Sequence, residues 1–218
     1  MDKLRLVYSQ LGRAAWCSHL DTMRTIQRAL NRADIPIRYS EGFNPHALIS
    51  ILMPLSVGTE SLCQIADIRV REDVDIAALP GRLTAALPEG FEVTACYEEA
   101  CKSADVKWLI ADGSWEYDDR DSEKAAEACR ALFSQPVDVM RRTKRGEGLF
   151  RITDHIRELT FTPDGGTLRI HAVVSCTEPT VNPTLLTDCV SAHLPEWKPD
   201  YARFCRVGLL KADGTKYF

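Results

Sequence analysis

The stretches SHLDTMRTIQRALNRADIP (residues 18–36) and YSEGFNPH (residues 39–46) decide the fold of the first half of this chain. Ser18 is a typical helix N-cap, and Asp21, three residues later, is the acidic partner of a capping box. We expect the helix to end at about Ala33, because Pro36 excludes helical backbone at the residue before it. The sequence therefore predicts one capped helix that leads into a polar loop.

This helix has two faces of different character. Apolar residues share one face at helical spacing: Leu20, Met23, Ile26, Leu30 and Ala33. Three arginines recur every four residues on the other side: Arg24, Arg28 and Arg32. Such a row contacts a phosphate backbone or an acidic partner, or it forms a solvated face with internal ion pairs. The sequence leaves both interpretations open.

The loop that follows carries the polar groups of a binding site. Gly42 can adopt positive φ, and Pro45 holds Asn44 in extended backbone, so the loop has a fixed shape that can aim Asn44 and His46 outward. An imidazole in that place donates to a phosphate, acts as a general acid or base, or ligates a metal. The structural alternative is a tight connection whose polar side chains satisfy local backbone groups.

The candidate residues follow from this pattern. The predicted ligand-binding set is Arg24, Arg28, Ser40, Gly42, Asn44 and His46. His19 lies at the N-terminus of the helix, where free N–H groups favour anions. His46 and His19 are therefore the candidate catalytic acid and base, whereas a flanking role for His19 beside the cap is the structural alternative.

The order of strand and helix patterns predicts an α+β fold. In the first half, strand patterns cover residues 3–9, 35–40, 48–55, 63–71 and 91–97, and helical patterns cover 18–33 and 76–87. In the second half, strand patterns cover 106–111, 137–142, 149–153, 158–162, 168–175 and 203–209, and helical patterns cover 122–133 and 183–193. The split β-α-β order predicts two tandem ferredoxin-like halves with antiparallel sheets, residues 1–100 and 105–218.

Two further charged features of the sequence are a basic cluster and an aspartate among apolar residues. The strongest basic cluster lies before a glycine-rich turn and comprises Arg141, Arg142, Lys144 and Arg145. It suits an RNA backbone or an anionic protein, and the alternative is a solvated turn. Asp67 lies among apolar residues, so we expect it to face inward and to pair with one of the helix arginines.

Composition excludes several classes of protein. The net charge of −4 argues against bulk coating of nucleic acid, although a local basic patch is compatible with it. The most apolar stretch, residues 48–57, is too short to span a bilayer. The start of the sequence has no apolar secretory segment, so we expect a cytoplasmic protein that does not contact the membrane.

The eight cysteines have no Cys-x-x-Cys spacing. We expect reduced, buried thiols that act as small hydrophobic residues, and we expect no cofactor and no metal. Zinc held by residues distant in sequence is the alternative.

The quoted stretches, together with Ile49-Ser50, Pro54-Leu55, Gly58 and Glu60-Ser61, resemble the radical-SAM-linked proteins. These are uncharacterised bacterial proteins found beside or fused to a radical SAM enzyme, and the resemblance is dense over residues 1–70. Ala47 stands where a second proline often follows in that family. The resemblance implies an accessory role beside a radical SAM protein in RNA modification or ribosome-related work. The chain lacks the Cys-x-x-x-Cys-x-x-Cys motif of the radical-generating cluster.

Three hypotheses of function result. The first is a non-catalytic subunit that binds or presents a substrate, with RNA as the expected anionic ligand. The second is an RNA-processing or RNA-modifying enzyme that uses His46 and His19, which requires both imidazoles to reach one reactive point. The third is a scaffold that binds only a protein partner.

Overall fold

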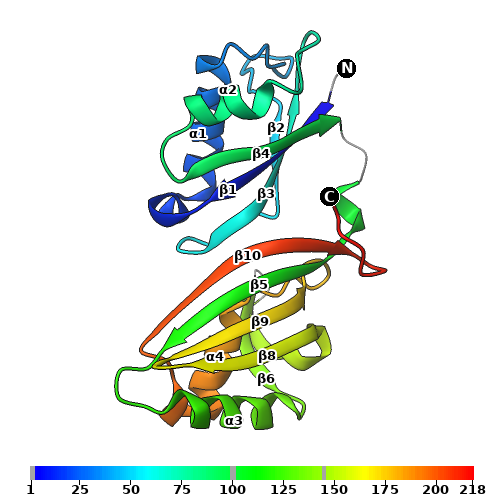
Figure 1. Ribbon diagram of the computed structural model, residues 1–218. Helices are drawn as coiled ribbons and strands as arrows, with labels where there is room; N and C mark the ends of the chain where they lie inside the picture. The colour runs from blue at the N-terminus through cyan, green and yellow to red at the C-terminus, as the bar shows by residue number, and fades with distance from the viewer. Residues whose placement is uncertain (1–2, 99–101, 144–145) are drawn as a thin grey trace. The chain divides into compact units, whose positions relative to one another are not determined.

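The computed structural model describes residues 3–98, 102–143 and 146–218. The chain divides into two compact units, Met1–Ser103 and Ala104–Phe218 (Figure 1). Each unit combines helices with antiparallel strands, which confirms the predicted α+β class. Within the described ranges, no helix is long and apolar enough to cross a membrane.

The first unit builds one antiparallel sheet with helices on one face. Its elements are β1 (Lys3–Gln10), α1 (His19–Arg32), β2 (Ile49–Leu52), β3 (Glu60–Arg69), α2 (Leu79–Ala86) and β4 (Phe91–Glu98). The strands lie in the order β4-β1-β3-β2. Leu4 and Leu6 of β1 share one core with Ile26 of α1 and Leu83 of α2, so both helices cover the same side of the sheet.

Helix α1 forms where the sequence predicts it. Ser18 is the N-cap, and its Oγ accepts a 3.2 Å hydrogen bond from Asp21 N. The side chains that α1 buries follow helical spacing: Thr22, Ile26, Ala29 and Leu30. Leu20 is an exception to the predicted apolar face, because it is 63% exposed in the first turn of the helix.

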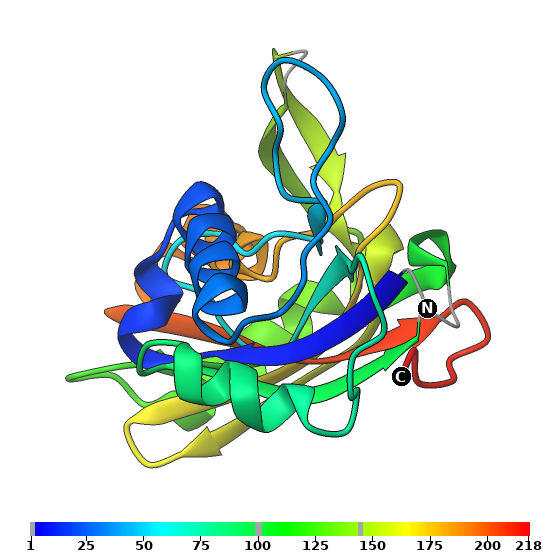
Figure 2. The same cartoon turned by 90° about the horizontal axis from the view of Figure 1, so that it is seen from above.

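The predicted strand at 35–40 does not form. Ile37 and Tyr39 make only isolated bridges, to Val70 and Ala47. Pro36 lacks an N–H, so this segment cannot build a continuous ladder from its start. The result is a loop between α1 and β2 that extends away from the rest of the first unit, seen as the azure segment in Figure 2.

The centre of this sheet holds a buried ion pair. Arg5 is fully buried and lies opposite Asp67 in the β1–β3 register. Arg5 Nε donates to Asp67 Oδ1 at 2.7 Å, and its Nη2 donates to Oδ2 at 3.0 Å. The expectation that a helix arginine pairs with Asp67 was wrong, because strand register places Arg5 directly across from it.

The second unit repeats this strand order and adds a hairpin. Its elements are β5 (Val106–Glu116), α3 (Ser122–Phe133), β6 (Asp138–Thr143), β7 (Gly146–Arg151), β8 (Ile156–Asp164), β9 (Thr167–Ser175), α4 (Thr184–His193) and β10 (Tyr201–Lys211). The main strands lie in the order β10-β5-β9-β8, while β6 and β7 pair only with each other. Trp115 and Phe161 meet in its core, with ring centroids 5.8 Å apart.

Candidate functional site

The loop between α1 and β2 is closed at its base by backbone pairing. Tyr39 bridges Ala47, and Ser40 N donates to His46 O at 2.8 Å. Just below this, Leu48 N donates to Arg38 O at 2.9 Å. These bonds hold the two ends of the loop together, so the residues between Ser40 and His46 form a short, constrained tip. We call residues 39–47 the tip loop.

Ser40 fixes the imidazole of His46 at the start of this tip. Its Oγ accepts a 3.1 Å hydrogen bond from His46 N and lies 2.8 Å from His46 Nδ1. When the hydroxyl proton goes to Nδ1, the ring proton resides on Nε2. His46 is exposed, so in this tautomer its Nε2–H is available to an acceptor outside the chain. The predicted residues Ser40 and His46 are therefore in direct contact.

The rest of the tip points to solvent. Gly42 has φ of 123°, a conformation that a residue with a Cβ rarely adopts. Asn44 is exposed and makes no hydrogen bond within the described part of the chain. The polar groups that the fold does not use thus gather at one protruding point.

Phe43 is a residue that the sequence reading missed. Its relative exposure is 111%, the highest value among the exposed large hydrophobic side chains of the described residues. A signal for it exists in the sequence, because the ring stands between Gly42 and Asn44-Pro45, outside any helical or alternating apolar pattern. A phenylalanine in a loop can still enter a core, so this signal does not by itself predict the exposure.

The three arginines of the predicted row differ in their contacts. Arg24 pairs with Asp21 at 3.6 Å on the surface. Arg32 donates to Ala86 O at the end of α2, and Arg82 of α2 donates in return to Ala33 O at the end of α1. All three arginines are exposed. Among the described residues, Arg28 is the one of the three that has no ion pair or hydrogen bond. It is the arginine of this row that is free to bind a ligand.

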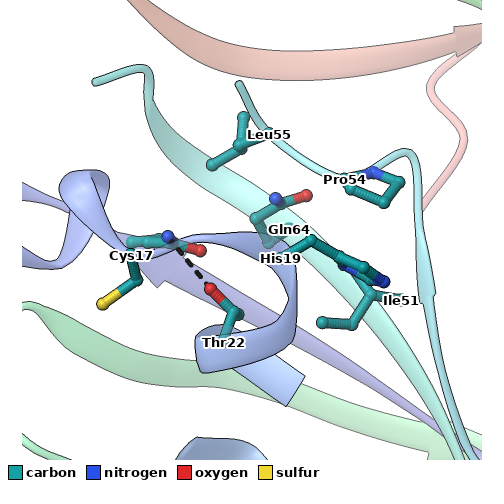
Figure 3. A pocket seen from close by; sticks show the side chains of 8 residues that line it. Cys17, His19, Thr22, Ile51, Pro54, Leu55 and Gln64 are labelled. Atoms are coloured by element: carbon teal, nitrogen blue, oxygen red, sulfur yellow. Dashed lines mark hydrogen bonds between the residues drawn. The ribbon is translucent and has the colours of Figure 1, made fainter. Parts of the chain in front are cut away.

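His19 belongs to a different place in the first unit. It lines a small pocket with Gln10, Thr22, Gln64 and further residues, namely Cys17, Ile51, Pro54 and Leu55 (Figure 3). The dashed line there is the 3.5 Å hydrogen bond from Gln10 Nε2 to Thr22 Oγ1. The pocket has about 10 Å³ of free volume, which is the room that one water molecule needs. It is too small for a substrate.

The structure does not bring His19 and His46 together. His19 lies against Ile51 and Pro54, whereas His46 precedes the start of β2. His46 is not among the residues that line the pocket of His19, which counts against a shared acid–base pair.

An apolar surface lies near the start of α1. Gly58 N donates to Ala15 O at 2.9 Å, and a Cβ on Gly58 would lie 3.4 Å from the Trp16 ring, so the residue that follows Val57 packs on this ring. Trp16 is 67% exposed and Val57 is 56% exposed. Exposed apolar side chains in a group are typical of protein–protein contacts.

In the predicted basic cluster, the structure describes the contacts of one side chain, that of Arg141. Arg141 donates to Thr180 O at 2.7 Å and its guanidinium lies 4.8 Å from the centroid of the Phe150 ring, so it is held by its own unit. Arg142 lies in β6 opposite Glu147. Lys144 and Arg145 lie outside the described residues.

Four of the described thiols are buried deeply enough for burial to raise their pKa. Burial raises the pKa of Cys96 and Cys176 to about 11 and that of Cys129 and Cys189 to about 12, so these thiols stay protonated at neutral pH. Cys101 lies outside the described residues. Among the residues that the structure describes, no group of His, Cys, Asp and Glu could hold a metal ion.

Comparison with known proteins gives a family. The family model described as "Uncharacterized protein conserved in bacteria (DUF2344)" matches residues 3–183. No curated protein matches the chain.

Two solved structures are similar in part. A chain of a Cbf5-Nop10-Gar1 complex aligns with a TM-score of 0.46 at 10% identity, covering 94% of this chain and 48% of that one. The present chain thus spans about half the length of that relative. A protein of unknown function from Galdieria sulphuraria aligns with a TM-score of 0.27 at 14% identity, covering 93% and 95% of the two chains. At these scores neither structure indicates a function.

Proposed function

The chain belongs to the DUF2344 family, and we propose that it is a non-catalytic accessory protein that binds RNA and presents it to a radical SAM enzyme. The observation that carries the proposal is the tip loop. Asn44 and the Nε2 atom of His46 make no hydrogen bond within the described residues, and the base of the loop is held by backbone pairing. A site of this kind suits recognition of a ligand that comes from outside the chain.

The ligand we propose is RNA because the loop and α1 offer complementary contacts. Arg28 supplies a free cation for a phosphate, and His46 supplies a second donor when its ring proton is on Nε2. Asn44 supplies an amide that can both donate and accept. The net charge of −4 then limits binding to this local site instead of a broad basic surface.

The partner we propose is a radical SAM protein, from the resemblance of residues 18–61 to the radical-SAM-linked proteins. The chain has no Cys-x-x-x-Cys-x-x-Cys motif, so radical chemistry belongs to the partner. The apolar surface of Trp16 and Val57 is a suitable place for a protein contact.

The architecture fits this role. We propose that each unit is a ferredoxin-like unit, since both have the strand order that places the first strand between the third and the fourth of the main strands. We propose a cytoplasmic location, where the cysteines stay reduced.

An enzyme that uses His46 and His19 is the weaker alternative. It needs both imidazoles near one reacting atom, yet His19 lines the small pocket and His46 does not. A scaffold that binds protein alone has one observation in its favour, the exposed ring of Trp16.

The test is RNA binding by a double variant, Arg28→Ala with His46→Ala. We expect its affinity for single-stranded RNA to fall at least about tenfold at low salt, because two phosphate donors are lost. Arg13→Ala is the matched control, since Arg13 is also exposed in the first unit but lies before α1. Unchanged affinity of the double variant, or an equal loss in the control, would reject the assigned site.

The partner is tested separately by co-purification from the native host. Wild-type protein is expected to retain a radical SAM protein, and Trp16→Ser is expected to lose it while RNA binding persists. Retention by the Trp16 variant would show that the partner binds elsewhere. Absence of any radical SAM protein from the wild-type sample would reject the proposed partnership.

A further inference from the structure

Phe43 is exposed to a degree that the fold itself does not explain. A relative exposure of 111% means that the ring is as open to water as in an extended peptide, with both of its faces uncovered. Leaving a phenylalanine in water has an unfavourable free energy of hydration. The Phe43 ring therefore adds nothing to the stability of the fold. Its position suits a contact in which a partner covers the ring.

The ring is held at the tip of a constrained loop. The Tyr39–Ala47 bridge and the Ser40–His46 hydrogen bonds fix the loop on both sides. Pro45 restricts the backbone just after Phe43. Little conformational entropy is lost when such a ring binds, which favours its use as a contact residue.

The charge of the tip distinguishes between possible ligand groups. Residues 39–47 contain no lysine and no arginine, and Glu41 is acidic. Such a tip does not attract phosphate groups by charge. What it presents is a flat apolar ring beside the amide of Asn44, and this pair matches the flat face and the polar edge of a nucleobase.

We infer that Phe43 stacks on an unpaired RNA base and that Asn44 contacts the edge of that base. This inference rests on the proposed function and gives its recognition mode: the tip loop reads a single-stranded nucleotide, while Arg28 holds the backbone. The ring needs an extruded or unpaired base, because bases in a duplex have no free face for it.

The experiment measures affinity for two RNA probes of about 12 nucleotides, one unpaired oligoadenylate and one with abasic riboses throughout. Phe43→Leu and Phe43→Tyr are compared with wild type at about 50 and 200 mM salt. Leucine keeps apolar volume but has no ring face, whereas tyrosine keeps the ring. Leu149→Ala is the matched control, because Leu149 is 75% exposed in the second unit.

We expect Phe43→Leu to weaken binding to oligoadenylate at least about fivefold, as expected for the loss of one stacked base. Phe43→Tyr should bind like wild type, and the salt dependence of Phe43→Leu should equal that of wild type, since no charge is removed. On the abasic probe the leucine variant and wild type should be equal. Because the side chain is exposed, all variants should unfold at the wild-type temperature.

Other outcomes overturn the inference. If wild type binds RNA but Phe43→Leu binds equally well, or if the loss is the same on the abasic probe, the ring does not stack on a base and the proposed function still stands. If Phe43→Leu keeps RNA affinity but loses a co-purified protein, the ring is a protein contact. Absence of RNA binding by wild type removes both the inference and the proposed function.

Discussion

In the first unit, the Arg5–Asp67 pair and the tip loop both gather polar side chains, but in opposite settings. Arg5 and Asp67 are buried and joined by two hydrogen bonds between β1 and β3, and Lys3 Nζ lies 3.3 Å from Asp67 Oδ2. In the tip loop, Ser40 orients His46, and the outer groups of His46 and Asn44 face solvent. The contrast shows that the buried polar side chains of this unit stabilise the fold. A ligand site is expected instead where polar groups are held in place but make no hydrogen bond within the unit.

The largest expected effect tests the buried side of this contrast. Asp67→Ala leaves the fully buried guanidinium of Arg5 without its carboxylate, so we expect a loss of about 3–5 kcal/mol in the free energy of unfolding. Urea unfolding measures it. Asp119→Ala, at an exposed carboxylate of the second unit, is the control and should change stability by less than about 0.5 kcal/mol.

A second change sharpens the same point. Replacing both partners, Arg5→Met with Asp67→Leu, should recover much of the lost stability, because no buried charge remains. If Asp67→Ala were as stable as the control, the pair would not be the structural element described above.

The next effect concerns two buried thiols whose pKa is raised chiefly by burial. Cys129 and Cys189 are fully buried, and burial raises the pKa of each thiol from 9.0 to about 12. Above pH 9 the unfolded thiols release protons that the folded thiols keep, so stability should fall as pH rises from about 9 to 12. We expect a loss of about 1 kcal/mol per thiol by pH 10.

Urea unfolding at about pH 8 and about pH 10 measures this loss, and Cys129→Ala isolates one thiol from other titrating groups. The variant should lose less stability than wild type over this interval. An equal loss in both proteins would show that Cys129 does not contribute to the alkaline sensitivity.

The smallest effect on stability tests the exposed side of the contrast. Ser40→Ala removes the bonds that orient His46 but touches no core residue, so unfolding should change by less than about 0.5 kcal/mol. RNA affinity should nevertheless fall about two- to fivefold, because the imidazole is no longer held for binding. Ser134→Ala, which removes a local bond to Ala131 O in the second unit, should change neither quantity. A large loss of stability in Ser40→Ala would place the tip loop among the structural elements.

Much of the fold was predictable because its signals are local. The cap at Ser18 and the bounds of α3 at Ser122–Phe133 depend on residues within one or two turns. Strand register depends on residues far apart in the chain, so the partner of Asp67 was assigned to a helix instead of Arg5. The segment after Pro36 looked like a strand because apolar residues alternate there, yet pairing of that segment is limited to isolated bridges.

The candidate site was predictable in part for the same reason. A turn of fixed shape is predicted by Gly42, Asn44 and Pro45. This turn brings Ser40 and His46 together. Exposure is not encoded locally, since a phenylalanine in a loop either enters a core or stays outside. For that reason Phe43 was overlooked, and Arg32, which binds the end of α2, could not be told apart from the free Arg28.

The bridge between Tyr39 and Ala47 also has a consequence for engineering. It pairs the two ends of the tip loop, so residues 40–46 can be replaced while the backbone on either side keeps its position. A short Asn-Gly turn in their place should leave the unit folded. Libraries of inserted sequences would then allow the choice of ligand to be altered while the sheet and its helices stay the same.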